Sequence, residues 1–532
     1  GIDYTHENFG GYSTFPNPKI PYGYDFADGD NDPMDHNGHG THVAGTIAGI
    51  GKAKFKDKDG NLVPLKGVAP DAKIIICKVF SDYGPYAYSA DIVAAIEYLI
   101  QLKQNGVNVV AANMSLGSDK GFDDPTDPEQ KAIKNGYLAG ITFAISAGNN
   151  AYFEYALGYN YIGLNAEGKY TSYVKDPARV GAPGASRYAI TVAAVNNQGT
   201  VLQGQKLTFD SDHVMYLTSG ESPDPVAVFK KQPVTIVDTN SLLCEVPQGD
   251  FKGKVLLGNR GTCTFEVKVN NARAAGASGV IIGNNDADAS LVSMALGSAA
   301  GTIPAVFIGG PDKLKLRSAI NAAGGSLQGV FSDEIATGYA ATNPNGMASF
   351  TSWGPAPNMA FKPTVAAPGV AIFSSTPGNQ YATMQGTSMA APHVAGAIAV
   401  IKQAHPDWTP EQIKQALVNT AEPISRYSPR VQGAGRINVA KAVKNSVFIT
   451  YNSQPYAELG SFTGNKTITL TITNKGPTTY TASITGYVTT SLEQIVYGNP
   501  GATYTVGSVS APASVTVDPG ATKTIQVTIQ PS

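Results

Sequence analysis

The sequence predicts an α/β fold, a doubly wound parallel sheet, which an inserted mixed α+β domain interrupts and an all-β domain follows. From about residue 37 to residue 195, short apolar runs alternate with segments of helical periodicity. The pattern then changes for roughly 145 residues, and the tail after residue 445 carries apolar residues at every second position. A chain of 532 residues is also too long for one domain of ordinary size.

The first predicted domain covers residues 1–195 and 345–445 and contains the alternating elements. Four apolar runs predict buried strands, and two segments between them have helical spacing: 73–79, 107–114, 141–146 and 189–195, and 89–104 and 129–137. Strands separated by helices of this length favour a parallel sheet. The chemistry of such sheets lies at the carboxyl ends of the strands.

The predicted insertion covers residues 196–344 and the predicted β-sandwich covers residues 446–532. The insertion has strand-like runs at 253–257 and 279–283 around an Ala-rich helix near 268–275. Helical character resumes near residue 352, where Thr409–Gln412 form a capping box with proline at the first helical position. The tail alternates with period two at 467–473, 514–517 and 524–529.

Composition excludes several classes of protein. The 38 Lys and Arg against 40 Asp and Glu give a net charge of -2, which argues against nucleic-acid partners. No apolar stretch is long enough to predict a membrane span, and the first residues do not resemble a signal peptide. Cys77 lies in an apolar strand and is expected in the core, whereas Cys244 and Cys263 are either a disulfide or two buried thiols.

Two motifs carry the candidate chemistry. Residues 39–45 (HGTHVAG) join a Gly-rich loop to a helix of small residues, so His39 can be held on one side and accept a proton on the other. Residues 386–396 (GTSMAAPHVAG) place Ser388 at the start of a second such helix, beside free N–H donors at its positive end. A lone histidine is more often structural and such a serine more often an N-cap, but the pair favours nucleophilic catalysis.

With Ser146–Asn150 (SAGNN) between them, the two motifs resemble those of the subtilases, the subtilisin-like serine proteases. The resemblance implies a subtilisin-like fold and hydrolysis of peptide bonds in extended protein substrates. It implies that His39 is the general base and later the general acid, that Ser388 is the nucleophile, and that Asn149 is a side-chain donor of the oxyanion hole.

The resemblance also implies a substrate-binding cleft. In this family the stretch that corresponds to Ser115, Leu116 and Gly117 lends its backbone to an extended peptide, and Ala147 and Gly148 form the other wall of the pocket for the residue before the cut. A pocket lined by glycine is expected to admit a large apolar or aromatic side chain.

One part of the family pattern is missing from the chain. The catalytic aspartate opens an Asp-Thr-Gly or Asp-Ser-Gly turn, and Gly1-Ile2-Asp3 matches the residues from that glycine onward. The aspartate is therefore expected two positions before Gly1, and Asp3 is not assigned its role. We favour a fragment whose upstream strand is absent, because loss of that strand would expose the sheet. The alternative is a catalytically impaired subtilase-fold protein that binds peptides.

Asp28-Gly29-Asp30-Asn31-Asp32 alternates acids as calcium loops do. An EF-hand would need an acid where His39 stands, so a solvated turn is favoured, and neither these aspartates nor Asp35 is expected to replace the triad aspartate. The resemblance leaves Ca²⁺ binding open with no assignable metal site. No organic cofactor is expected.

Both accessory regions resemble modules of large secreted bacterial subtilases. Residues 253–265 and 272–277 resemble the protease-associated (PA) domain, and the tail resembles a fibronectin-III-like module. We therefore expect a secreted or cell-envelope protein, monomeric, whose partners are proteins or peptides. An adhesive surface protein built around the tail is disfavoured because it would leave the motifs unexplained.

Overall fold

The structure, a computed structural model, describes residues 1–84, 86–151, 178–292, 294, 296–425, 427–460, 462–486, 488 and 507–531. Two compact units are present. The first comprises Gly1–Lys54, Pro64–Gln198 and Thr342–Ser532, and the second comprises Phe55–Val63 and Gly199–Ala341. Each unit is described by itself.

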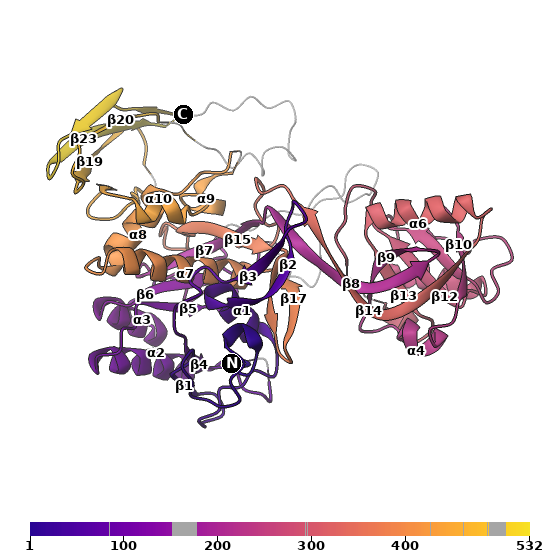
Figure 1. The fold of residues 1–532 in the computed structure, drawn as a ribbon. Coiled ribbons are helices and arrows are strands. Elements are labelled where there is room, and N and C mark those ends of the chain that lie inside the picture. Colours follow the sequence, from indigo (N-terminus) through magenta and orange to yellow (C-terminus); the bar gives the residue numbers. More distant parts are fainter. Residues whose placement is uncertain are drawn as a thin grey trace. The chain divides into compact units, whose positions relative to one another are not determined.

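A four-stranded parallel sheet forms the centre of the first unit (Figure 1). Its order is β15-β7-β6-β5, and the bounds are β5 (Ala111–Met114), β6 (Thr142–Ser146), β7 (Ala189–Asn196) and β15 (Val365–Val370). Alternate residues of β6 serve opposite faces: Phe143 and Ile145 belong to one buried apolar cluster, and Ala144 belongs to another. The predicted parallel α/β sheet is therefore confirmed.

Helices cover both faces of this sheet. The helices α2 (Ser89–Gln104) and α3 (Pro128–Leu138) pack with Phe143 and Ile145, and α7 (Thr387–Ala404) contributes Ala390, Val394 and Ile398 to the cluster on the opposite face. The helix α8 (Pro410–Asn419) begins with the predicted capping box, in which Thr409 and Gln412 each bond the other's backbone.

Shorter elements surround the sheet. They are η1 (Glu7–Phe9), β1 (Tyr22–Asp25), α1 (His39–Ala48), β2 (Ile50–Lys56), β3 (Leu62–Lys66), β4 (Ile75–Lys78), β16 (Ile372–Thr376), β17 (Gln380–Met384), α9 (Pro429–Gln432) and α10 (Val439–Val443). The strands β1 and β4 pair in parallel as a separate two-stranded sheet. The helices α1 and α7 pack against each other through Val43 and Met389.

The second unit is built on a closed seven-stranded barrel of order β10-β11-β12-β13-β9-β8-β14. Its elements are β8 (Gly199–Phe209), β9 (Asp212–Thr218), α4 (Pro225–Phe229), β10 (Val234–Asp238), β11 (Val255–Asn259), α5 (Phe265–Ala274), β12 (Gly279–Gly283), η2 (Gly297–Ala299), β13 (Ala305–Ile308), α6 (Gly310–Ala322) and β14 (Leu327–Ala341). Of the two alternatives for Cys244 and Cys263, the structure has the disulfide.

The C-terminal region forms two antiparallel sheets. A four-stranded sheet has the order β18-β19-β23-β21, and β20 pairs with β22. The bounds are β18 (Val447–Thr450), β19 (Lys466–Asn474), β20 (Tyr480–Ser483), β21 (Ser508–Ser510), β22 (Ser514–Val517) and β23 (Thr522–Gln530). In β19, Ile468 and Ile472 are buried while Thr467 and Thr469 are exposed, which is the period-two pattern of the sequence.

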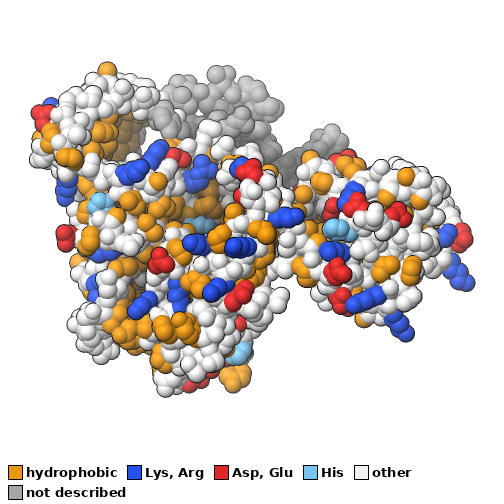
Figure 2. All heavy atoms as spheres, viewed as in Figure 1, with side chains coloured by type: hydrophobic (Ala, Val, Ile, Leu, Met, Phe, Trp, Pro, Cys, Tyr) orange, Lys and Arg blue, Asp and Glu red, His pale blue; other side chains and the backbone are white. Residues whose placement is uncertain are grey.

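The surface is mixed in charge. Figure 2 shows basic and acidic side chains interspersed on the visible face, in keeping with the net charge of -2. Among the described helices, none has the length and hydropathy that crossing a membrane requires.

Candidate active site

His39 is the first residue of α1, and the loop before it is held by one carboxylate. The preceding Gly38 caps the helix with φ 104°, a left-handed conformation that favours glycine. Asp35 accepts hydrogen bonds from the N–H groups of Asn37 and Gly38 at 2.9 Å and from the N–H and hydroxyl of Thr41 at 2.8 and 2.6 Å. These bonds fix the turn that presents the imidazole.

Two effects act on the imidazole of His39. Burial lowers the pKa of His39 below its ordinary value, and the carboxylate of Asp35 opposes this shift. Gly1 lies directly against the helix start, because a Cβ on Gly40 would be 2.0 Å from the carbonyl oxygen of Gly1. The lowered pKa favours the neutral imidazole, the form that can act as a base near neutral pH.

Ser388 is the second residue of α7, and an asparagine side chain bonds the residue before it. The Oδ1 atom of Asn149 accepts hydrogen bonds from the N–H and the hydroxyl of Thr387, both at 2.9 Å. A Cβ on Gly386 would lie 3.5 Å from Nδ2 of Asn149 and 3.6 Å from the backbone nitrogen of Ser388. Two nitrogen donors therefore border one space next to the serine, at the positive end of an 18-residue helix.

The end of β5 lies beside the serine. The hydroxyl of Ser388 donates to the carbonyl of Ser115 at 3.4 Å, and the hydroxyl of Ser115 donates to the carbonyl of Ser388 at 2.7 Å. The carbonyl of Leu116 accepts from the hydroxyl of Ser146 at 3.1 Å, and a Cβ on Gly117 would be 3.0 Å from the carbonyl of Ala182. Each residue of the segment 115–117 is thus held by a contact with a neighbouring segment.

The end of β6 meets the same helix. The N–H of Gly148 donates to the hydroxyl of Thr387 at 3.1 Å, and the carbonyl of Ala147 accepts from the N–H of Gly181 at 3.0 Å. Gly148 has φ 103°, and a Cβ there would be 2.8 Å from the hydroxyl of Ser352. The structure therefore brings Ser115, Asn149 and Ser388 together where two neighbouring parallel strands end.

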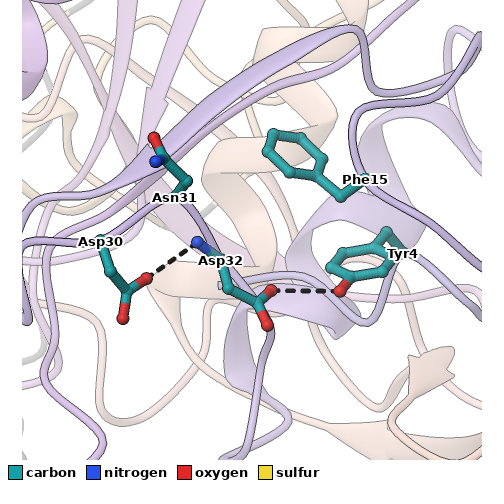
Figure 3. Close-up of a pocket in the computed structure, with 5 residues that line it drawn as sticks. All are labelled: Tyr4, Phe15, Asp30, Asn31 and Asp32. Atoms are coloured by element: carbon teal, nitrogen blue, oxygen red, sulfur yellow. Dashed lines mark hydrogen bonds between the residues drawn. The ribbon is translucent and has the colours of Figure 1, made fainter.

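The aspartates between Asp28 and Asp32 do not gather around one point. A surface pocket of about 340 Å³ is lined by Tyr4, Phe15, Asp30, Asn31 and Asp32 (Figure 3). In it, Asp32 accepts from the hydroxyl of Tyr4 at 3.1 Å, and Asp30 accepts from the N–H of Asp32 at 2.8 Å. Burial and the neighbouring charge of Asp32 raise the pKa of Tyr4.

Asp28 turns instead toward a cluster formed by Asp25, Asp82 and Lys78. Each of the three carboxylates places an oxygen within 4.8 Å of the others, a spacing that a metal ion could use. The ammonium of Lys78 already lies among them, 2.6 Å from Asp25, 2.8 Å from Asp82 and 3.3 Å from Asp28. Within the described residues, none of Asp28, Asp30, Asp32 and Asp35 is hydrogen-bonded to the imidazole of His39.

Two residues of this arrangement have structural roles that the motifs alone did not assign. Thr387 bonds both Asn149 and Gly148, and Asp35 holds the turn before His39. Thr387 stands inside the quoted motif, between Gly386 and Ser388, so its position was visible but its partners were not. Asp35 was considered in the sequence only as a replacement for the triad aspartate, and not as the residue that holds the turn.

Comparisons with known proteins identify the family of the chain. A family profile described as "Subtilase family" (Peptidase_S8) matches residues 1–447. The chain is 34% identical to the PII-type proteinase of Lactococcus lactis subsp. cremoris over 505 residues, which is 86% of this chain and 25% of that protein. It is 31% identical to the minor extracellular protease Vpr of Bacillus subtilis (strain 168) over 503 residues, 88% of this chain and 54% of that protein.

The chain therefore spans about a quarter to a half of the length of these relatives. Among solved structures, a psychrophilic subtilisin-like protease, Apa1, from the Antarctic bacterium Pseudoalteromonas sp. AS-11 gives a TM-score of 0.48 at 20% sequence identity. That match covers 83% of this chain and 90% of the other.

Proposed function

The chain belongs to the subtilase family, and from this premise we propose that it is a serine endopeptidase that cuts extended protein substrates through an acyl-enzyme on Ser388. The observation that carries the proposal is that Nδ2 of Asn149 and the backbone nitrogen of Ser388 lie near one point, 3.5 and 3.6 Å from where a Cβ on Gly386 would stand. Donors fixed around one point suit the oxyanion of a tetrahedral intermediate. A serine that served only as a helix cap would not need a second donor from another segment of the chain.

In the proposed reaction, the hydroxyl oxygen of Ser388 attacks the carbonyl carbon of the scissile bond while His39 takes the hydroxyl proton. The developing oxyanion receives hydrogen bonds from Asn149 and from the N–H of Ser388. His39 then gives the proton to the departing amine. In a second round, water attacks the acyl-enzyme with His39 again as the base, and the carboxylic acid product is released. The peptide is expected to lie along Ser115, Leu116 and Gly117, with the side chain before the cut between that segment and Ala147–Gly148.

The imidazole also needs a carboxylate to hold its tautomer. We place that carboxylate on an aspartate two positions before Gly1 in a longer chain. One observation supports this: the backbone of Gly1 lies against Gly40, the residue that follows His39.

Labelling with a fluorophosphonate tests the proposal. The probe should form one adduct per molecule on Ser388 in the chain that includes its upstream residues, and Ser388→Ala should form none. Hydrolysis of a fluorogenic peptide should disappear in the same variant. If Ser388 forms the adduct but the protein does not hydrolyse peptides, the endopeptidase proposal would give way to a narrower acyl-transfer activity. If the folded protein binds peptides but forms no adduct, peptide binding would remain as the function.

Further proposals concern the rest of the chain. The barrel unit is proposed to be a PA domain within residues 196–344, and residues 446–532 are proposed to be a fibronectin-III-like module; the catalytic domain would then be 1–195 and 345–445. We also propose a monomer. The proposed location is secreted or cell-envelope, in line with the name of the Bacillus relative, a minor extracellular protease. Calcium binding, which is common in subtilases, is proposed without a site.

A further inference from the structure

The only disulfide of the described chain has a buried ammonium group against its sulfur atoms. The bridge joins Cys244 and Cys263, whose Cα atoms are 5.6 Å apart, in the second unit. Lys268 is fully buried, and its Nζ lies 3.3 Å from Sγ of Cys263 and 3.8 Å from Sγ of Cys244. Neither cysteine is fully buried, so a small thiol can reach the bridge.

The remaining partners of this ammonium are neutral. Its Nζ donates to the carbonyl of Gly261 at 2.9 Å and to the carbonyl of Leu242. Within the described residues, the partners of the Lys268 ammonium are carbonyl oxygens and sulfur atoms, and no carboxylate forms an ion pair with it. A buried ammonium without a counter-charge gains free energy when a negative group forms next to it.

The other charged groups near the bridge form hydrogen bonds with other residues or are exposed to solvent. Glu266, on the same helix as Lys268, accepts a hydrogen bond from the N–H of Ser298 at 2.8 Å, and Arg260 donates to Asn284 at 3.0 Å. Glu245, which follows Cys244, is exposed. The ammonium of Lys268 is therefore the charge that acts on the two sulfur atoms at short range.

Reduction of the bridge would supply the missing counter-charge. A thiolate on Cys263 would lie 3.3 Å from the ammonium, whereas the neutral disulfide sulfur offers only a weak acceptor. Cys263 also directly precedes Thr264, the N-cap of the ten-residue helix α5, whose positive end favours the thiolate. The same contacts favour Cys263 over Cys244 as the leaving sulfur.

We propose that the Cys244–Cys263 bridge is a reducible thiol-exchange site, in which Lys268 stabilises the Cys263 thiolate that leaves when a dithiol attacks Cys244. The first thiolate of the dithiol forms a bond to Sγ of Cys244, the Sγ–Sγ bond breaks, and Cys263 keeps the electron pair. The second thiol of the reductant then loses its proton and closes the reductant's own disulfide. Cys244 is released and takes up one proton, and the other proton of the dithiol goes to solvent. Two electrons pass from the dithiol to the protein.

The first experiment measures the equilibrium between the protein disulfide and dithiothreitol by alkylation and intact mass. Lys268→Met keeps an unbranched side chain, one atom shorter and without the charge. It should make the bridge about tenfold harder to reduce, which lowers the reduction potential by about 30 mV. The control is Lys252→Met, an exposed lysine of the same unit, which should leave the equilibrium unchanged. Equal potentials for the wild type and Lys268→Met would overturn the proposal.

The second experiment uses only the wild-type protein, so it stands even where Lys268→Met fails to fold. Brief exposure to glutathione should give a mixed disulfide on Cys244, found by peptide mapping, while Cys263 is trapped by iodoacetamide. After full reduction, Cys263 should be alkylated at a lower pH than Cys244. A mixed disulfide on Cys263, or identical alkylation profiles because reduction unfolds the unit, would refute the assigned roles.

Discussion

Replacing Lys78 by methionine should destabilise the first unit and make its stability depend on a divalent cation. The side chain of Lys78 is 4% exposed, and its ammonium lies among Asp25, Asp28 and Asp82 at 2.6, 3.3 and 2.8 Å. Burial alone would lower the pKa of this ammonium, but the hydrogen bonds and charges of Asp25 and Asp82 outweigh it and raise the pKa. Methionine fills a similar volume and leaves the carboxylates without their cation.

The size of the loss follows from burial. Removing one partner of a buried ion pair costs about 3–5 kcal/mol, because the remaining charge is uncompensated. Asp82 is 33% exposed, so water screens part of this cost and the lower end of the range is expected. With an unfolding entropy of about 2.1 cal/mol/K per residue over roughly 380 residues, a loss of about 3 kcal/mol lowers Tm by about 4 °C.

The same variant opens a set of oxygen ligands. The three carboxylates place oxygens within 4.8 Å of one another, so Ca²⁺ can enter where the ammonium was. A ligand at about 100 times its Kd returns about 2.7 kcal/mol, most of the expected loss. Calcium should therefore raise the Tm of Lys78→Met by several degrees more than it raises the Tm of the wild type.

The assay is thermal unfolding followed by circular dichroism, in EDTA and in excess Ca²⁺. Lys73→Met, an exposed lysine just before the same strand, serves as the matched control and should behave as the wild type. The reasoning is refuted if Lys78→Met melts with the wild type in EDTA, or if calcium gives the two proteins the same increment.

Four further predictions follow from the site and from a second buried lysine. Asn149→Ala should lower turnover by about 10²–10³-fold in a peptide assay, which is the loss that removal of the oxyanion-hole asparagine causes in subtilisin. Thr387→Val should lower kcat about tenfold with little change in KM, because it removes the hydroxyl that bonds Asn149. Asp35→Asn should shift the acid limb of the kcat/KM profile to lower pH, since the charge of Asp35 opposes the lowered pKa of His39. Burial lowers the pKa of Lys362 to about 7 in the folded chain. Between about pH 7 and 10, Lys362 is therefore protonated in the unfolded chain but not in the folded one, and the free energy of unfolding rises with pH. Urea titrations should show this rise in the wild type and not in Lys362→Met.

The α/β elements could be predicted because their signals are local. The helix over 89–104 and the strand over 141–146 have their own periodicity, and the structure has them as Ser89–Gln104 and Thr142–Ser146. The strand predicted from residue 107 begins only at Ala111. The N–H of Val109 bonds the carbonyl of Val107 in a turn after the helix, and an apolar run does not show where a ladder begins.

The barrel of the second unit could not be predicted from periodicity. It closes because β8 and β14, more than a hundred residues apart, pair over most of their length, from Gly199 with Ala341 to Thr208 with Val330. Neither strand contains a local sign of its partner, because pairing between distant strands depends on the whole topology. The runs at 253–257 and 279–283 were correctly predicted as strands, but the closed arrangement was not.

In the candidate site, too, local features could be predicted and long-range contacts could not. His39, Ser388 and Asn149 were identified by short motifs, which name residue types that the chemistry requires. The hydrogen bonds that hold them, from Thr387 to Asn149 and from Gly148 to Thr387, join segments that lie 238 and 239 residues apart. Motifs assign candidate roles, whereas the bonds that fix geometry depend on which strand ends meet.

The burial of three lysines could not be predicted from the sequence, because a lysine usually predicts an exposed position. Lys78, Lys268 and Lys362 are each less than 5% exposed, and their partners differ in kind. The ammonium of Lys78 lies among carboxylates, that of Lys268 contacts carbonyls and sulfur, and that of Lys362 donates to two carbonyls and a threonine hydroxyl. Substitution by methionine leaves buried negative charge only at Lys78, whereas at Lys362 it leaves neutral acceptors and removes a cost of burying charge. Lys78→Met should therefore be the more damaging change at neutral pH, although both side chains are equally hidden from water.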